Sequence, residues 1–394
     1  NGYVLNEEPV KFKVSSNIAY ETLPDGSTPM ITVKMSDQAV KGKIQIEKRG
    51  EVLVDFKDGR FIYEERGLEG RIAEVIADED ILDPSNDGTV IYPAGTVVDT
   101  ITTDQDGKGL SKELPLGKYE IHEIKAPNGY VLNTEEKHVE LTYKDQTTSL
   151  VFSDLQSYFN ERQKIELNIK KTDDETGIGL EGAVYGLYAK QDVINADGAV
   201  ILKADSLIEK SISDVNGELE FNADLPLGDY YVKELQAPIG YASSNEVFEV
   251  PAVYKGQDIS TITFSKTFKN AITKVEVSKK DITNDEEIAG AFLTVYPKDD
   301  EGAIYASWVS GQDGVNEDGT IKPHMIKGLE VGKTYILKEI SSPHGYALAQ
   351  DVEFTIGDTG EIQKVEMKDE LVVGQLKWRK FGEIFDQVIT GQTE

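Results

Sequence analysis

A stretch that closes on Gly-Tyr occurs three times in this chain, at intervals of roughly 100 residues or more. Its copies read GKYEIHEIKAPNGY at 117–130, GDYYVKELQAPIGY at 228–241 and GKTYILKEISSPHGY at 332–346. A remnant, Asn1-Gly2-Tyr3, opens the chain. Because solenoid repeats have much shorter periods, each copy is predicted to mark one whole domain.

Within each copy, apolar side chains alternate along a predicted strand, and a glutamate takes the next place on the same face. The three glutamates are Glu123, Glu234 and Glu339. Each occupies a position where a buried apolar residue is expected. Because an unpaired buried charge is costly, the pattern predicts that each carboxyl group is neutral, paired or functional.

Two further polar residues fall on inward-facing positions of each unit. Alternation along the first strand leads to a lysine, and alternation along the last strand leads to Asn or Asp, with Leu150, Phe152 and Tyr158 expected inward before Asn160. The complete sets are Lys48, Glu123 and Asn160; Lys171, Glu234 and Asn270; and Lys279, Glu339 and Asp369. Two incomplete sets contain one such residue each, without partners: Asp37 and Lys380. Asp37 follows the alternating residues Ile31, Val33 and Met35. Because the same three residue types recur at inward-facing strand positions in each unit, a shared chemical role is favoured over chance ion pairs.

These marks divide the chain into five predicted parts: 1–41 and 373–394 as incomplete repeats, and 42–164, 165–272 and 273–372 as complete ones. Short alternating runs without long helical periodicity predict all-β sandwiches. Turn signals at Asp104–Gly107, Asn195–Gly198, Val215–Gly217 and Glu317–Gly319 predict hairpins. Boundaries without Gly/Ser-rich or Pro-rich spacers predict closely stacked domains, and therefore a rod.

Composition excludes several classes of function. A net charge of −30 argues against nucleic acid and anionic membrane surfaces as partners. The absence of cysteine excludes disulfides, thiol catalysis and thiolate metal sites. No apolar run is long enough to span a bilayer. Because the chain begins inside the motif and carries no signal peptide, we interpret it as a piece of a longer protein.

Lysine, glutamate and Asn or Asp brought together in a dry interior permit one particular reaction. Burial favours the neutral amine and the protonated acid. The acid can then polarise the carboxamide or carboxyl group while the amine attacks it. The predicted products are Lys48–Asn160, Lys171–Asn270 and Lys279–Asp369 amides, with Glu123, Glu234 and Glu339 as the catalytic acids. This is a self-modification without turnover.

The sequence LNIKKTDDETGIGLEGA at 167–183, followed by YVKELQAPIGY and Phe268-Lys269-Asn270, resembles the collagen-adhesin B-type repeat, also called the SpaA-like or prealbumin-like domain, of Gram-positive surface proteins. The resemblance implies Ig-like sandwiches with spontaneous isopeptide bonds. By position it implies the lysine, acid and acceptor roles already given to the three sets, with Asp37 and Lys380 as orphan halves. The first unit lacks the K-x-D start, and in the third Asp369 replaces Asn and SSPHGY replaces A-P-x-G-Y.

The resemblance also implies an extracellular, cell-wall-anchored protein, whose repeats form an adhesin stalk. It leaves host extracellular matrix or another surface protein open as a partner, beside the neighbouring repeats. A sortase-polymerised pilin is the alternative, because VYPK at 295–298 resembles a pilus-linking motif, although it aligns with the ordinary strand sequence LYAK at 187–190. A ligand-binding module is a further alternative, with the insertion at 80–93 as its best candidate loop.

Turnover enzymes and metal sites find little support in the sequence. The histidines (His122, His138, His324 and His344) are scattered, and His122-Glu123 lacks the second histidine of a zinc-protease helix. No nucleophile elbow is present. The acidic turns at 104–107 and 281–287 do not follow the EF-hand pattern. We therefore predict no metal and no cofactor.

Overall fold

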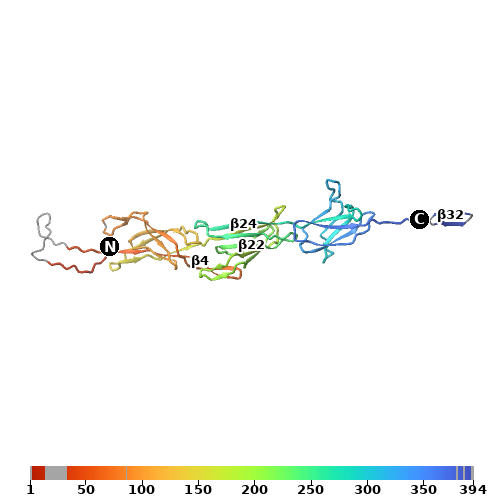
Figure 1. Ribbon diagram of the computed structural model, residues 1–394. Coiled ribbons are helices and arrows are strands. Elements are labelled where there is room, and N and C mark those ends of the chain that lie inside the picture. The colour runs from red at the N-terminus through yellow and green to blue at the C-terminus, as the bar shows by residue number, and fades with distance from the viewer. Residues whose placement is uncertain (1, 14–32, 86, 379, 385–386, 392–394) are drawn as a thin grey trace.

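The computed structural model describes residues 2–13, 33–85, 87–378, 380–384 and 387–391. The described residues form strands and turns but no helix, which confirms the all-β prediction, and so none of them forms a bilayer-spanning helix. Figure 1 shows three sandwiches in a row, with the two ends of the chain at opposite ends of an elongated molecule.

In the first sandwich a four-stranded sheet packs against two further sheets, one built on β3 (Lys41–Lys43) and one built on β4 (Gln45–Lys57). The four-stranded sheet has the order β13-β12-β6-β9, with strands Lys137–Leu141, Gly117–Lys125, Ile72–Ala77 and Val97–Thr102. Opposite it lie β3, β4, β5 (Arg60–Gly67), β10 (Lys108–Leu110), β11 (Leu114–Pro115), β14 (Leu150–Phe152) and β15 (Gln156–Asn160). The insertion forms a small ribbon of β7 (Ile81–Leu82) and β8 (Val90–Tyr92).

The second and third sandwiches repeat this plan. In the second, the sheet β21-β16-β24 (Glu218–Leu219, Lys164–Asp173, Thr261–Asn270) faces β20-β17-β22-β23 (Leu207–Ile212, Val184–Ala189, Gly228–Gln236, Val247–Ala252), and β18 (Val193–Ile194) pairs with β19 (Val200–Leu202). In the third, β28-β25-β31 (His324–Lys327, Lys274–Asp281, Ile362–Asp369) faces β27-β26-β29-β30 (Ala306–Val309, Phe292–Pro297, Thr334–Ser341, Val352–Thr355). Each sandwich encloses its own cluster of buried apolar side chains.

Outside the sandwiches, the described residues form two short ribbons. Near the start of the chain, β1 (Tyr3–Val4) pairs with β2 (Gln38–Ala39). Near its end, β32 (Lys380–Ile384) pairs with β33 (Gln387–Gly391).

The first and last strands of every sandwich lie side by side and run parallel. The pairs are β4 with β15, β16 with β24, and β25 with β31. The rest of each domain forms the long crossover connection that a parallel pair needs. This pairing fixes the register between the lysine strand and the acceptor strand.

Two details of the sequence prediction are wrong. Phe152 is exposed and Val151 is buried instead, because residues 153–155 form no strand, separate β14 from β15 and break the alternation that leads to Asn160. The alternation through Val33 and Met35 does not form a strand, since residues 33–37 have no strand pairing and both side chains are exposed, and Ile31 lies outside the described residues.

The predicted turns are present, but only two of them close a hairpin-like pair. Asn195–Gly198 joins β18 to β19, and Glu317–Gly319 lies inside the bridge between Val315 and Ile321. The turns at Asp104–Gly107 and Val215–Gly217 instead carry the chain from one sheet of a sandwich to the other, since β9 and β10, like β20 and β21, belong to different sheets.

A long hairpin of β4 and β5 reaches from the first sandwich onto the second (Figure 1). Phe61 is buried within the apolar cluster of the second sandwich, with Leu53, Phe56 and Tyr63 packed against it. The backbone carbonyl of Leu53 accepts a hydrogen bond from Ala196 N at 2.9 Å. The hairpin therefore extends the core of one domain with side chains of its neighbour.

Polar contacts reinforce this joint. The guanidinium of Arg162, in the link between the domains, lies 3.8 Å from the centre of the Tyr63 ring and forms an ion pair with Asp224. Tyr63 also donates to the Asp224 carbonyl at 2.8 Å. At the next joint, Thr273 Oγ1 donates to the Gly240 carbonyl at 3.2 Å, and Glu175 pairs with Lys274. Both joints fit the close stacking predicted from the short boundaries.

Replacing Phe61 by alanine should release the hairpin without unfolding either sandwich. Removal of a buried phenylalanine side chain costs about 3–5 kcal/mol, and here that cost falls on the contact between domains. In hydrogen exchange, amides of 53–63 should lose protection while those of β16 and β24 keep theirs. Phe152→Ala, which removes an exposed phenylalanine, is the matched control. Equal protection of the hairpin in both variants would contradict this account of the joint.

Candidate cross-link sites

The three predicted lysines are buried inside the sandwiches. Lys48 and Lys171 have no exposed surface, and Lys279 is 1% exposed. They lie on β4, β16 and β25, and their partners on the parallel neighbouring strand are Tyr158, Phe268 and Met367. A lysine in such apolar surroundings is stable only as a neutral amine or beside an opposite charge.

The acceptor residues occupy the same register position in all three domains. Each lies two residues beyond the partner of the lysine: Asn160, Asn270 and Asp369. Side chains two apart on a strand share a face, so each acceptor points into the interior beside the lysine. Asn160, Asn270 and Asp369 are at most 3% exposed.

The glutamates approach from the opposite sheet, and a β-bulge follows each of them. The register of β12 against β6 shifts just after Glu123, and the ladders of β22 and β29 shift just after Glu234 and Glu339. A bulge bends its strand and re-aims the neighbouring side chain. Each strand thus keeps regular pairing up to the glutamate and turns away after it.

In the first domain all three predicted residues meet. Lys48 Nζ lies 3.1 Å from Glu123 Oε2, and Asn160 Nδ2 donates to Glu123 Oε1 at 2.9 Å. The backbone N–H of Asn133 donates to the same carboxylate at 3.2 Å. The Asn160 Oδ1 atom has no donor among the described residues, although it is buried. A protonated Glu123 would favour the flipped amide, in which Oδ1 accepts its hydrogen bond.

In the second domain Glu234 contacts the acceptor Asn270, but the lysine nitrogen makes no hydrogen bond or ion pair with the carboxylate among the described residues. Asn270 Nδ2 donates to both oxygens of Glu234, at 2.9 and 3.1 Å. Tyr185 donates its hydroxyl to the same carboxylate at 3.2 Å. Lys171 Nζ instead donates to the Thr172 carbonyl at 3.5 Å.

In the third domain one lysine faces two carboxyl groups. Lys279 Nζ lies 3.0 Å from Glu339 Oε1 and also contacts Asp369 Oδ1. The backbone N–H of Ala349 donates to Glu339 Oε2 at 2.7 Å. The site therefore buries two carboxyl groups beside a single lysine amine.

Burial moves the proton equilibria of these sites toward neutral groups. It lowers the pKa of Lys48 to about 8, against the opposing attraction of Glu123. It lowers the pKa of Lys171 to about 8 as well, against the attraction of Glu234. Burial also raises the pKa of Asp369 above its usual value, although Lys279 acts in the opposite direction. Each change increases the population of the form that condensation requires.

The tyrosine that closes each motif bridges to the residue two places after the acceptor. The bridges join Tyr130 to Arg162, Tyr241 to Ile272 and Tyr346 to Leu371. The Tyr346 hydroxyl donates to Asp281 of the K-x-D start at 2.7 Å, whereas Tyr130 donates to the Glu51 carbonyl at 2.7 Å. The motif therefore ties the start of the domain to its end.

The residues predicted as orphan halves have no complete site among the described residues. Tyr3 pairs with Ala39, which places Asp37 two residues before the tyrosine's partner, as in the complete domains. Asp37 itself is exposed. Lys380 begins β32, and its side chain lies outside what the structure describes.

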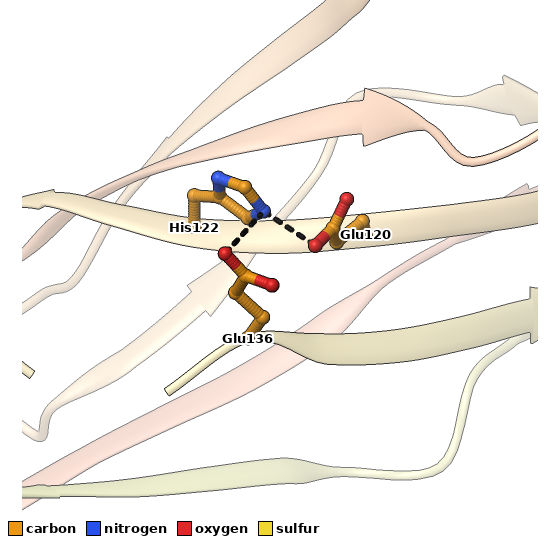
Figure 2. A group of neighbouring side chains, drawn as sticks. All are labelled: Glu120, His122 and Glu136. Carbon is orange, nitrogen blue, oxygen red and sulfur yellow. Dashed lines mark ion pairs between the residues drawn. The ribbon is translucent and has the colours of Figure 1, made fainter. Parts of the chain in front are cut away.

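A separate group of ligand-type side chains lies on the outer face of the first sandwich. Figure 2 shows His122 between Glu120 and Glu136, with Nε2 2.6 Å from Glu120 Oε1 and 3.8 Å from Glu136 Oε1. The hydrogen bond from His122 lowers the pKa of Glu120. Glu136 is exposed, and the arrangement is that of a surface ion-pair cluster.

The sequence predictions missed one buried charge near the first site. Arg71 has no exposed surface, and its Nε lies 3.7 Å from Glu123 Oε1. The available signal was a mismatch between repeats, since Leu68-Glu69-Gly70-Arg71 stands where the second repeat has Leu180-Glu181-Gly182-Ala183.

The lowered pKa of Lys171 predicts a pH-dependent stability in an unlinked domain. Asn270→Ala removes the acceptor and keeps the amine free. Between about pH 8 and about pH 10.4 the unfolded lysine binds a proton that the folded one has released, so stability rises with pH in that window. The free energy of unfolding, measured against Asn270→Ala combined with Lys171→Met, should show the lysine penalty below about pH 8 and its loss above about pH 10.4. A constant difference between the two proteins across this range would contradict the prediction.

Comparison with known proteins places the three sandwiches in one family. Residues 67–156, 165–267 and 273–371 match the family described as SpaA, prealbumin-like fold domain. The trypsin-resistant surface T6 protein of Streptococcus pyogenes is 49% identical over 39 residues, which span 10% of this chain and 7% of that protein.

Among solved structures, the Bacillus anthracis TIE protein is similar with a TM-score of 0.50 and 25% identity, over 85% of this chain and 52% of that one. BcpA, the major pilin subunit of Bacillus cereus, aligns over 84% of this chain and all of that one, with a TM-score of 0.38 and 15% identity. This chain therefore spans only part of the T6 and TIE proteins. The family matches cover more than half of the chain, and the chain belongs to the SpaA family of prealbumin-like fold domains.

Proposed function

We propose that this chain is a stalk segment of a bacterial cell-surface adhesin, in which each sandwich is locked by an amide bond that it forms itself. The observation that carries the proposal is the threefold recurrence of a buried lysine beside a buried acceptor on parallel first and last strands. The proposed bonds are Lys48–Asn160, Lys171–Asn270 and Lys279–Asp369. An ordinary structural ion pair would not need the same strand register three times.

Each bond forms by one condensation. In the asparagine sites, the neutral lysine nitrogen attacks Cγ while the protonated glutamate donates to the carboxamide oxygen. The new C–N bond forms, the Cγ–Nδ2 bond breaks, and the glutamate passes the amine proton to the departing nitrogen, which leaves as ammonia. In the third site the acceptor is the protonated carboxyl group of Asp369, and water leaves. Each site reacts once, so the chain is no turnover enzyme.

The bonds would close loops of about 90 to 110 residues, which contributes about 4–5 kcal/mol per domain in the chain-entropy model known from disulfides. Unlike a disulfide, an amide cannot be reduced. Pulling force that enters the first strand would pass directly into the last strand of the same sandwich. This suits an extracellular, cell-wall-anchored protein under shear, with neighbouring repeats as direct partners and a host matrix or another surface protein at the tip.

The intact mass of the purified chain tests this proposal. We expect a deficit of two ammonias and one water relative to the encoded sequence, because each domain loses one small molecule. Tandem mass spectrometry should recover the three linked peptide pairs. A chain with its full encoded mass would overturn the proposal.

Glu234→Ala tests the role assigned to the glutamates. The variant should regain the mass of one ammonia, because the second site lacks its acid, and should unfold at a lower temperature. Glu249→Ala removes an exposed glutamate of the neighbouring strand and is the matched control, expected to keep the full deficit. Retention of the second cross-link in Glu234→Ala would show that Glu234 is not the acid.

A sortase-polymerised pilin is the second candidate function, and it makes a different prediction. Lys298 directly follows β26, is about half exposed and pairs with Glu353 at 2.7 Å, so its amine is accessible from outside. Lys190 occupies the equivalent place after β17 and pairs with Glu249, which favours an ordinary strand-end role for both. High-mass ladders on cells that vanish with Lys298→Ala, but persist with Lys190→Ala, would favour the pilin.

A further inference from the structure

Arg71 makes the first site chemically different from the other two. Glu123, Glu234 and Glu339 pair across the sheet with Ala73, Tyr185 and Leu293. Two residues earlier, directly before the strands β6, β17 and β26, lie Arg71, Ala183 and Ala291, all fully buried. Their backbone N–H groups also share a partner type, since each donates to a buried Thr or Ser hydroxyl. The equivalence of the three positions is therefore structural, and one of them carries a guanidinium.

The guanidinium lies within the reactive cluster. Its Nε is 3.7 Å from Glu123 Oε1, the oxygen to which Asn160 also donates, and its Cζ is 4.0 Å from the centre of the Tyr158 ring. None of its three nitrogens has a hydrogen-bond acceptor among the described residues. A buried cation this close to a carboxylate strongly favours the ionised carboxylate, because the interior screens charges weakly.

The charges of the site can be counted. Three charged residues occupy the interior: Lys48 on β4, Glu123 on β12, and Arg71 directly before β6. At its margin, Glu135 acts on Lys48 from the segment before β13, and Lys137 on β13 lies 4.6 Å from the centre of the Tyr158 ring. The two marginal charges cancel. With Lys48 protonated the interior carries one excess positive charge, and with Lys48 neutral it carries none.

We propose that Arg71 holds Glu123 as a carboxylate, so that in this domain Lys48 must lose its proton to solvent before the Lys48–Asn160 bond can form. Arg71 is a positioning residue that acts through Glu123. This inference rests on the proposed function and, in the first site alone, replaces the protonated glutamate of that mechanism with a carboxylate. In the second domain Ala183 takes the place of Arg71, so Glu234 can take up a proton when Lys171 releases one, and the site keeps the same number of protons.

The reaction remains balanced with a carboxylate in place of an acid. Lys48 Nζ attacks Cγ of Asn160, and Glu123 accepts a proton from the attacking nitrogen. The Cγ–Nδ2 bond then breaks, Glu123 returns that proton to Nδ2, and ammonia leaves. Negative charge that develops on Oδ1 needs a donor, and the unpartnered N–H groups of Arg71 are available in the same buried cluster. Arg71 stays protonated throughout.

The two proton paths predict different pH dependences. In the second domain the reactive form has a neutral lysine and a protonated glutamate, and it holds as many protons as the lysine–glutamate ion pair. The fraction of reactive form therefore does not depend on pH as long as the site holds one proton. In the first domain the reactive form has lost one proton to solvent. Its rate should therefore rise about tenfold per pH unit and level off near the pKa of Lys48, which burial lowers to about 8.

The test compares the domains within one full-length chain. Chain recovered unlinked from inclusion bodies is diluted from denaturant into buffers between about pH 6 and about pH 9, and linked peptides are counted at intervals by mass spectrometry. We expect Lys48–Asn160 to form about 50-fold faster at pH 8 than at pH 6, and Lys171–Asn270 to change little. This comparison needs no mutation.

Two variants separate the charge of Arg71 from its bulk. Arg71→Met keeps a long side chain without charge and should flatten the pH profile of the first domain, whereas Arg71→Lys keeps a cation and should retain the slope. A flat profile for Lys48–Asn160 in the unmodified chain would overturn the inference, as would an unchanged slope in Arg71→Met. If only the second and third bonds form, the inference fails while the proposed function stands for those domains. If no bond forms in any domain, both fail.

Discussion

The parallel pairing of the first and last strands is the constraint on which each domain depends. It brings residues about 90 to 110 positions apart into one register, in which the lysine and the acceptor always lie two places apart on one inward face. A buried lysine in an apolar core would ordinarily destabilise the fold. In the first and third domains the opposite sheet offsets this cost by placing a glutamate carboxyl group beside the lysine nitrogen. Groups that are each costly to bury alone are thus more easily buried together.

The sequence motif has a physical explanation in this arrangement. The alternating strand carries the glutamate inward, the bulge behind it ends the regular ladder, and the Gly-Tyr turn returns the chain to the last strand beside the acceptor. In the third domain the closing tyrosine hydrogen-bonds the Asp of the K-x-D start. The first domain lacks that Asp and uses a backbone carbonyl at Glu51 instead. Motif residues far apart in sequence thus recur together because they contact one another where the start of the domain, the Gly-Tyr turn and the last strand meet.

Much of the fold and of the site could be predicted from alternation alone, because a strand period of two leaves little freedom where one face is buried. That argument placed Lys48, Glu123 and Asn160 in one interior, and it failed at Phe152, where an interruption of the strand broke the period. Alternation could not show that the Asp104–Gly107 turn joins two sheets, since a turn sequence does not determine whether the strands on either side pair with each other. The β4–β5 hairpin was also beyond it, because Phe61 finds its burial in another domain.

Differences between the repeats carry information that the shared pattern hides. The hairpin and Arg162 tie the first sandwich to the second through an apolar contact and a stacked cation, whereas Thr273, Glu175 and Ser243 make polar contacts across the next joint. The first joint therefore includes a shared apolar core in addition to its polar contacts. Arg71 likewise gives the first site its own electrostatics within a common frame. A row of domains built on one plan can in this way vary its joints and its proton chemistry without changing the strand register that holds each domain closed.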